Sequence, residues 1–282
     1  MGSFEKVRMI AVLSLVSLVG VNVHLGNLKA MDMPEPVNAL QEASGLASSK
    51  IVDLNDLTTN PNNYEFFTFR PNLEKLILSG TADTEHISIL WYTVPDGSVG
   101  QHYHSMTESV YTIEGTQTDA KGVYPTGSLY FNPPGSGHEI SDSTGFFILA
   151  YASPPDFTNT DLIEEYTPVQ IDTDDPDLED IYPFENQREG LGIYNLPLDP
   201  QGGMSAQFIK STSSQGYQYQ GNYLLVLRGS CNIDGTAFNE KILVVATTVE
   251  SQFYEVSAGE DSSCLALGLS FLNTDLNTEQ GL

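Results

Sequence analysis

The sequence predicts an all-β protein whose length of 282 residues suits about two domains. Short apolar runs rich in β-branched and aromatic residues recur, and Gly, Pro, Asn and Asp bound them. Long helical periodicity is absent after the first 30 residues. Regularly spaced short strands with turn signals favour sandwiches or barrels. The clearest strand candidates are 65–69, 87–94, 109–114, 128–132, 146–152, 223–228, 242–247 and 265–271.

The N-terminal segment, residues 1–30, is typical of an export signal. Lys6 and Arg8 precede a mostly apolar run over 9–23, which is the order of a signal peptide. The run is short for a membrane span, which needs roughly 20 residues. We therefore expect an exported protein, periplasmic or extracellular. The alternatives are an uncleaved N-terminal anchor and a buried strand.

The charge balance limits the partners of this chain. It has 37 Asp and Glu against 11 Lys and Arg, a formal net charge of −26. Such a surface repels phosphate backbones and anionic headgroups, so we expect no nucleic acid and no peripheral membrane binding. It also disfavours a small dianion such as oxalate. The remaining partner class is a small-molecule substrate or ligand.

An acidic stretch over 156–185 divides the chain. It carries acidic residues and prolines but no Lys or Arg, which predicts a connector wrapped over the surface. The flanking domains are then 31–155 and 186–282. A calcium loop is the alternative, but it lacks the glycine and the closing Glu of an EF-hand. Its ligands would be Asp172, Asp174, Asp175 and Asp177.

The two cysteines, Cys231 and Cys264, both lie in the second domain. In an exported protein they can form one disulfide. Two buried thiols are the alternative.

Three of the five histidines occur with a glutamate in a pattern that suits a metal. His102 and His104 point to the same face of a strand, because side chains alternate. Glu108 follows a short turn and His138 comes from a later segment. Three imidazoles and one carboxylate suit a divalent transition metal such as Fe, Zn, Mn or Ni. Positions left free on the metal would accept water, substrate or oxygen.

The surrounding residues resemble the two sequence motifs of the cupin superfamily. In the first motif His102, His104, Glu108 and Gly115 fit, while Gly97 is one residue too close. In the second motif Gly127, Pro133, Gly135 and His138 fit, and Asp142 replaces an Asn. The resemblance implies a double-stranded β-helix (jelly-roll) barrel that binds one metal ion through His102, His104, Glu108 and His138.

The segment from Gly115 to His138 is also similar to the cupin half of ChrR-type anti-sigma factors. The anti-sigma activity is not implied, because its zinc module needs cysteines and none precedes Cys231.

A shift of 114 residues superimposes the second domain on the first without gaps, which indicates an internal repeat. Gly115 then meets Gly229 and Leu129 meets Leu243. The four ligands fall on Gly216, Gln218, Asn222 and Gln252, which are poor transition-metal ligands. We therefore expect two cupin barrels in tandem, a bicupin whose second barrel lacks a metal. Two barrels already resemble a cupin dimer, so a further homodimer is optional.

Two functions fit this site. The first is a metal-dependent dioxygenase, because cupins with this ligand set include enzymes that cleave diketones, hydroxy-ketones and phenolic flavonols. The second is a non-catalytic cupin that binds zinc or a small molecule. Five aromatic residues are expected either to line an apolar pocket or to pack in the core: Trp91, Tyr92, Tyr130, Phe147 and Tyr151. Tyr111 is expected to face out of the barrel, and no catalytic acid or base is identified.

Overall fold

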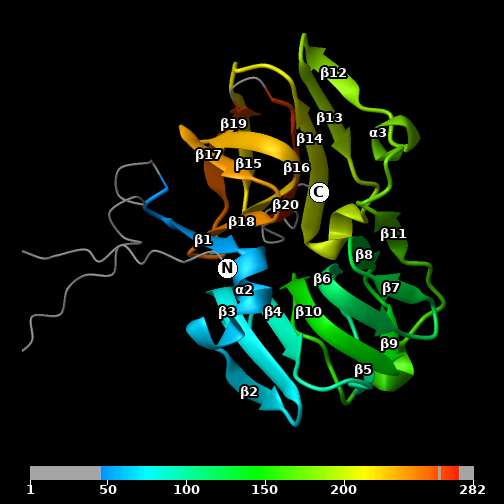
Figure 1. The fold of residues 1–282 in the computed structure, drawn as a ribbon. Helices are drawn as coiled ribbons and strands as arrows, with labels where there is room; N and C mark the ends of the chain where they lie inside the picture. Colours follow the sequence, from blue (N-terminus) through cyan, green and yellow to red (C-terminus); the bar gives the residue numbers. More distant parts are fainter. Residues whose placement is uncertain (1–45, 260–261, 273–282) are drawn as a thin grey trace, which may run out of the picture. The chain divides into compact units, whose positions relative to one another are not determined.

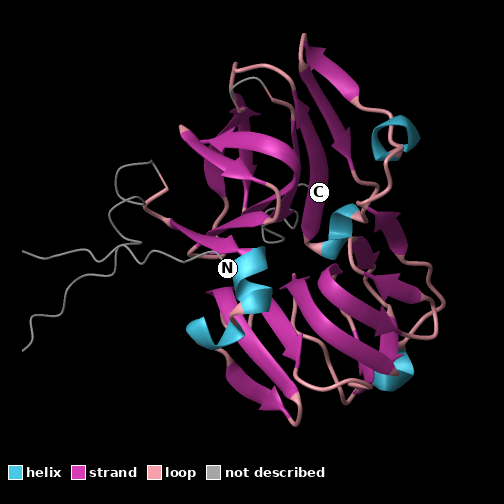
Figure 2. Ribbon diagram, viewed as in Figure 1, coloured by secondary structure: helices cyan, strands magenta, loops and turns pink. Residues whose placement is uncertain are grey.

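The computed structural model describes residues 46–259 and 262–272, and β-strands dominate this part of the chain (Figures 1 and 2). The predicted export segment, 1–30, lies outside the described residues. No helix within the described ranges is long and apolar enough to span a membrane. The described strands form two double-stranded β-helix barrels in tandem, the fold class that the sequence predicts.

The first barrel consists of an 8-stranded sheet in the order β11-β8-β6-β10-β4-β3-β2, with β7 beside β6, and a 2-stranded sheet of β5 and β9. In chain order its strands are β2 (Phe67–Arg70), β3 (Leu73–Gly80), β4 (His86–Tyr92), β5 (Val99–Tyr103), β6 (Glu108–Thr118), β7 (Val123–Pro125), β8 (Ser128–Asn132), β9 (Gly137–Ile140), β10 (Asp142–Tyr151) and β11 (Val169–Asp172).

The second barrel repeats this arrangement in a 10-stranded sheet with the main order β1-β18-β16-β20-β14-β13-β12. Strands β15, β17 and β19 pair off this path. In chain order its strands are β1 (Ser49–Asp53), β12 (Glu185–Arg188), β13 (Leu191–Asn195), β14 (Met204–Ser211), β15 (Tyr217–Gly221), β16 (Tyr223–Ile233), β17 (Thr236–Asn239), β18 (Ile242–Ala246), β19 (Gln252–Ala258) and β20 (Cys264–Phe271).

Each barrel is completed by an edge strand that lies outside its own predicted domain in the sequence. Strand β1 precedes the first barrel but pairs with β18 of the second, beside which it lies in Figure 1. Strand β11 follows the first barrel and pairs with β8. Both pairings cover strand edges that would otherwise be open to association. The predicted boundaries at 155 and 186 therefore do not coincide with the limits of the sheets.

The acidic stretch 156–185 is more than a surface connector. It contains β11 and the short helix α3 (Leu178–Ile181). Ile171 and Leu178 are buried, while the neighbouring acidic residues face outward. In β11 the apolar Val169 and Ile171 alternate with the exposed Gln170 and Asp172, so one face packs on the barrel and the other stays in water.

Three hydrophobic clusters stabilise the fold. One fills the first barrel and includes Val110 and Tyr130, and a second fills the second barrel. The third cluster combines residues of both large sheets, such as Ile148 and Leu267. It also contains Tyr111, which faces out of its barrel as alternation predicts. Because the two sheets share this cluster, the described residues form one compact unit.

Helices are short and lie at connections. Asp53 caps the N-terminus of α2 (Leu54–Thr59) by accepting hydrogen bonds from two backbone amides. Leu54 and Leu57 of this helix are buried in the shared cluster. Three short 3₁₀ helices are η1 (Pro61–Asn63), η2 (Thr160–Leu162) and η3 (Pro200–Gly202).

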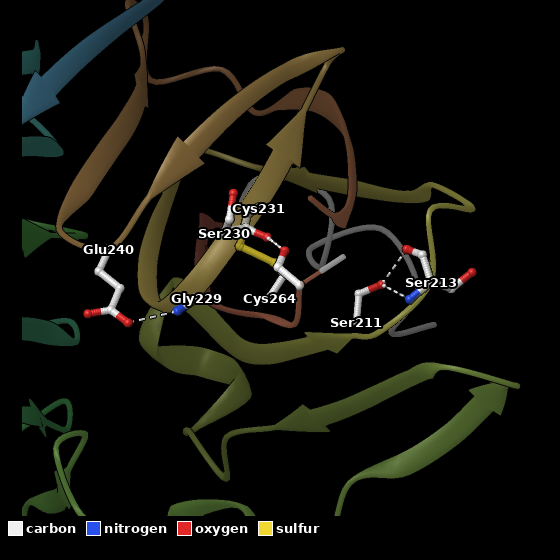
Figure 3. The surroundings of a disulfide bond; sticks show 8 residues. Ser211, Ser213, Gly229, Ser230, Cys231, Glu240 and Cys264 are labelled. Atoms are coloured by element: carbon white, nitrogen blue, oxygen red, sulfur yellow. Dashed lines mark hydrogen bonds between the residues drawn. A yellow bond between two sulfur atoms is a disulfide. The ribbon is translucent and has the colours of Figure 1, made fainter. Parts of the chain in front are cut away.

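Cys231 and Cys264 form a disulfide, so of the two alternatives the paired one is correct (Figure 3). The bond joins β16 to the start of β20, and both cysteines are buried inside the second barrel.

Candidate metal centre

The structure brings the four predicted ligands together inside the first barrel. His102 on β5 lies opposite His138 on β9. His104 follows β5, and Glu108 begins β6. All four side chains are buried, and one ligand atom from each lies within 4.8 Å of the others. Among the described residues this is the one such cluster of three or more potential ligands, and the connector aspartates do not form another.

The distances within the cluster suit a shared cation. Glu108 Oε2 lies 3.3 Å from His104 Nε2 and 3.4 Å from His138 Nε2. Both of these imidazole nitrogens are buried and have no hydrogen-bond partner among the described residues. Buried polar atoms normally have partners, so these orphaned nitrogens fit a divalent metal ion at this place. The site geometry supports a divalent metal.

Neighbouring residues orient three of the ligands. His138 Nδ1 donates to Asp119 Oδ2 at 2.8 Å, and His102 Nδ1 donates to the carbonyl of Gly100 at 2.9 Å. These contacts direct Nε2 of each ring toward the cluster, as is common for metal-ligating histidines. Asn132 Nδ2 donates to Glu108 Oε2 at 2.8 Å. No sequence signal pointed to Asp119 or Asn132, because both come from other turns and strands.

The electrostatics of the cluster favour neutral imidazoles at two positions and a carboxylate at the third. Burial lowers the pKa of His102 to about 3 and that of His104 to about 4. Burial would raise the pKa of Glu108, but the nearby histidines outweigh it and hold that pKa below its usual range.

His138 differs from the other two histidines. Burial would lower its pKa, but the hydrogen bond to Asp119 and the negative charge of the nearby Glu108 outweigh this effect and raise the pKa to about 9. Two carboxylates therefore favour a positive charge at this point of the cluster. A metal cation satisfies the same preference in place of the proton.

Three of the four predicted ligands, His102, Glu108 and His138, line a cavity of about 110 Å³ in the first barrel. Apolar side chains such as Leu90, Val99 and Leu149 form most of its wall. Phe69 and Phe157 are partly exposed and mark its mouth.

Two of the five aromatic residues singled out in the sequence, Tyr92 and Tyr151, line this cavity. Tyr130 and Phe147 pack in the barrel core instead. Trp91 stacks on Phe146 in the cluster shared by the two sheets, outside the barrel interior.

Two basic residues that the sequence analysis did not assign also line the cavity. Lys75 on β3 and His86 on β4 are buried, and their Nζ and Nε2 atoms lie 2.8 Å apart. His86 was visible in the sequence only as one of five histidines. Lys75 lies in a strand that the sequence analysis did not predict separately.

Among its described residues the second barrel carries no equivalent group of ligands, although the gapless register is wrong for part of it. Asn222 takes the place of Glu108, as predicted, because the bulges beside Gly115 and Gly229 coincide. The buried pair on β15 and β19 is Tyr219 with Tyr254, in place of His102 with His138. The connection from β15 to β16 is shorter than that from β5 to β6, so Gly216, Gln218 and Gln252 are not the counterparts of the histidines.

The comparisons with known proteins agree with a cupin barrel. Residues 54–154, about a third of the chain, match the model of the ChrR cupin-like domain family. This match and the barrel around the four ligands support assignment to the cupin superfamily. A search of curated proteins finds no match.

Several solved structures are similar to this chain at low sequence identity. A candidate dioxygenase from Nostoc punctiforme has 11% identity and a TM-score of 0.49, over 80% of this chain and 84% of that one. A deletion variant of Bacillus subtilis oxalate decarboxylase has 13% identity and a TM-score of 0.45, over 89% and 87%. The fold assignment rests on the strand pairing of this chain itself.

Proposed function

We propose that this chain is an exported, metal-dependent oxidoreductase of the dioxygenase kind. Its substrate would be a small chelating organic molecule, such as a diketone, a hydroxy-ketone or a phenol. The observation that carries the proposal is the buried set of three histidines and one glutamate, three of which line a mostly apolar cavity. A site of this kind can bind a small organic molecule beside the metal and exclude bulk water.

The chain's own residues would divide the work. His102, His104, Glu108 and His138 would hold the ion, and Asp119 would fix the ring of His138. When bound, Fe, Mn or Ni would supply chelation of two substrate oxygens and a path for electrons to dioxygen. The apolar wall would orient the carbon skeleton of the substrate.

Export is supported by two independent features. The basic and apolar N-terminal segment is typical of a signal peptide. The disulfide between Cys231 and Cys264 is typical of proteins in oxidising compartments. Partial purification from the producing cell's medium or periplasm, followed by N-terminal mass analysis, would test this part. An intact Met1 in cytosolic protein would contradict it.

Elemental analysis of protein purified without added metal tests the function. We expect about one Fe, Mn or Ni per chain, and loss of that metal in His104→Ala, because His104 is a fully buried ligand. Glu108→Gln should also lose metal. Glu114→Gln is the matched control, since Glu114 lies on the same strand but is exposed.

Oxygen uptake with a panel of diketones, hydroxy-ketones and phenols then tests turnover. We expect uptake with the wild type and Glu114→Gln, and none with His104→Ala. Stoichiometric zinc without oxygen uptake would instead support the second function, a metal or small-molecule binding protein. Absence of metal from the wild type would overturn both the dioxygenase function and the metal-binding function.

A further inference from the structure

Lys75 is an unusual lysine because its ammonium is buried without a carboxylate partner. Its side chain is 3% exposed. Among the described residues no acidic oxygen lies within salt-bridge distance of Lys75, whereas Lys121 and Lys210 pair with Glu165 and Glu179. A buried charge is costly unless it is paired. The missing partner therefore points to a ligand that enters the cavity.

The contacts of Lys75 hold it in position and leave donors free. His86 Nδ1 donates to the carbonyl of Thr84 at 2.8 Å, which makes Nε2 the acceptor for the Lys75 ammonium. Burial, reinforced by Lys75, lowers the pKa of His86 to about 4, so this imidazole is neutral. An ammonium has three donors, and one hydrogen bond from Lys75 is found among the described residues.

The remaining surroundings of the ammonium are aromatic. Its nitrogen lies 4.8 Å from the ring centre of Phe69 and 5.5 Å from that of Tyr151. The Tyr151 ring lies between the two polar groups of the cavity, with its centre 5.0 Å from that of His86 and 6.2 Å from that of His104. Lys75 thus lines the same small cavity as Tyr151 and three of the predicted ligands, His102, Glu108 and His138.

The charge on Lys75 persists near neutral pH. Burial lowers the pKa of Lys75 to about 8, and the attraction of Glu108 limits the decrease. The amine is therefore mainly protonated at pH 7. In a chain with a net charge of −26 and 11 basic residues, this ammonium makes the cavity locally attractive to an anion that the surface would otherwise repel.

We propose that Lys75, held by His86, binds an anionic oxygen of the substrate, so that the substrate is a small organic monoanion with an apolar body. This inference rests on the proposed function, because it concerns the same cavity. The metal side would take the chelating oxygens, and Lys75 would select for the negative charge. Lys75 would then determine specificity.

Calorimetric titration of zinc-loaded protein with two matched probes tests the proposal. Benzoate carries the charge, and benzyl alcohol has a similar ring without it. We expect benzoate to bind the wild type at least about tenfold more tightly than benzyl alcohol, as a charge-assisted hydrogen bond implies. In Lys75→Gln, the affinity for benzoate should fall by about tenfold or more, while the affinity for benzyl alcohol should stay the same.

Three variants make the result specific. The amide of Lys75→Gln can still donate to His86, so the pocket wall is preserved without the charge. If Lys75→Gln does not fold, Lys75→Met replaces it as the variant without the charge. Lys50→Gln is the control, because Lys50 lies exposed on β1 and should behave as the wild type.

The proposal is overturned if Lys75→Gln retains the preference for benzoate, because the metal or Arg70 near the mouth would then hold the carboxylate. It is also overturned if the wild type shows no preference. Metal content, measured on the same samples, separates this failure from that of the proposed function. If the wild type binds no zinc, the proposed function fails, and titration of the metal-free protein still decides whether Lys75 selects the anion.

Discussion

At the scale of single residues, the cluster depends on carboxylates that do different tasks. Glu108 faces the imidazole nitrogens directly. Asp119 lies behind His138 and fixes its ring through Nδ1. The same Asp119 also accepts hydrogen bonds from the backbone of Lys121 and Gly122 through Oδ1. One side chain therefore couples the shape of a turn to the orientation of a ligand.

We expect Asp119→Asn to weaken metal binding by about 10- to 100-fold, the usual cost of removing such a partner. The amide oxygen can still hold the turn, but its NH₂ group cannot accept the Nδ1 proton of His138. Competition with a chromophoric chelator measures the affinity. Asp142→Asn, at an exposed position of β10, is the control. Equal affinities for Asp119→Asn and the wild type would contradict the assigned role.

Residues of the cluster differ in how well the sequence predicted them. His102 and His104 were expected to share a face of one strand; His104 lies one residue beyond the end of β5, yet both side chains reach the cluster. Glu108 and His138 were expected from their motif spacing. Lys75, His86, Asp119 and Asn132 reach the site from other strands and turns, and no local pattern connects them to it.

At the scale of elements, the second barrel has a disulfide where the first has none among its described residues. Cys231 on β16 and Cys264 on β20 are 33 residues apart in sequence, with Cα atoms at 4.8 Å. The crosslink joins strands that belong to the same barrel. The second barrel also has a shorter connection before β16 and a buried Tyr219–Tyr254 pair in place of the histidines.

Replacing both cysteines by alanine should lower the free energy of unfolding by about 3 to 4 kcal/mol, from the loop that the disulfide closes. Thermal unfolding measures this loss. Metal content should be unchanged, because all four ligands belong to the first barrel. An unchanged Tm would contradict the stabilising role, and loss of metal would show that the barrels are coupled more tightly than their shared cluster suggests.

At the scale of the whole molecule, the fold leaves a large negative charge without neutralising it. The net charge of −26 implies repulsion across the surface, while the shared hydrophobic cluster joins the two sheets. The exchanged strands β1 and β11 add backbone pairing between distant parts of the sequence. We therefore expect the stability of the fold to depend on the ionic strength of the medium.

We expect added NaCl to raise the Tm at pH 7 by a few degrees, because salt screens like charges on the surface. The sequence pI is about 4.1, so near that pH the net charge is close to zero and the same salt should change the Tm much less. A differential scanning calorimetry series at both pH values measures the effect. Equal shifts at the two values would contradict the repulsion argument.

The sequence by itself determined the all-β class, because strand alternation and turn signals are local features. The tandem barrels were expected from the internal repeat, and the four predicted ligands from the resemblance of their spacing to the cupin motifs; the structure brings those four side chains together. The sequence also predicted that Asn222 replaces Glu108, because β6 and β16 keep the same bulge.

The tertiary structure alone decided which barrel β1 and β11 complete, and that Lys75 and His86 face the metal ligands across the cavity. It also showed which residues of the second barrel take the places of the histidines. The connection from β15 to β16 is shorter than that from β5 to β6, so β15 is shifted relative to β16. Such choices depend on which strand edges are covered and which side chains share a buried space. They involve residues far apart in the chain, so no local pattern encodes them.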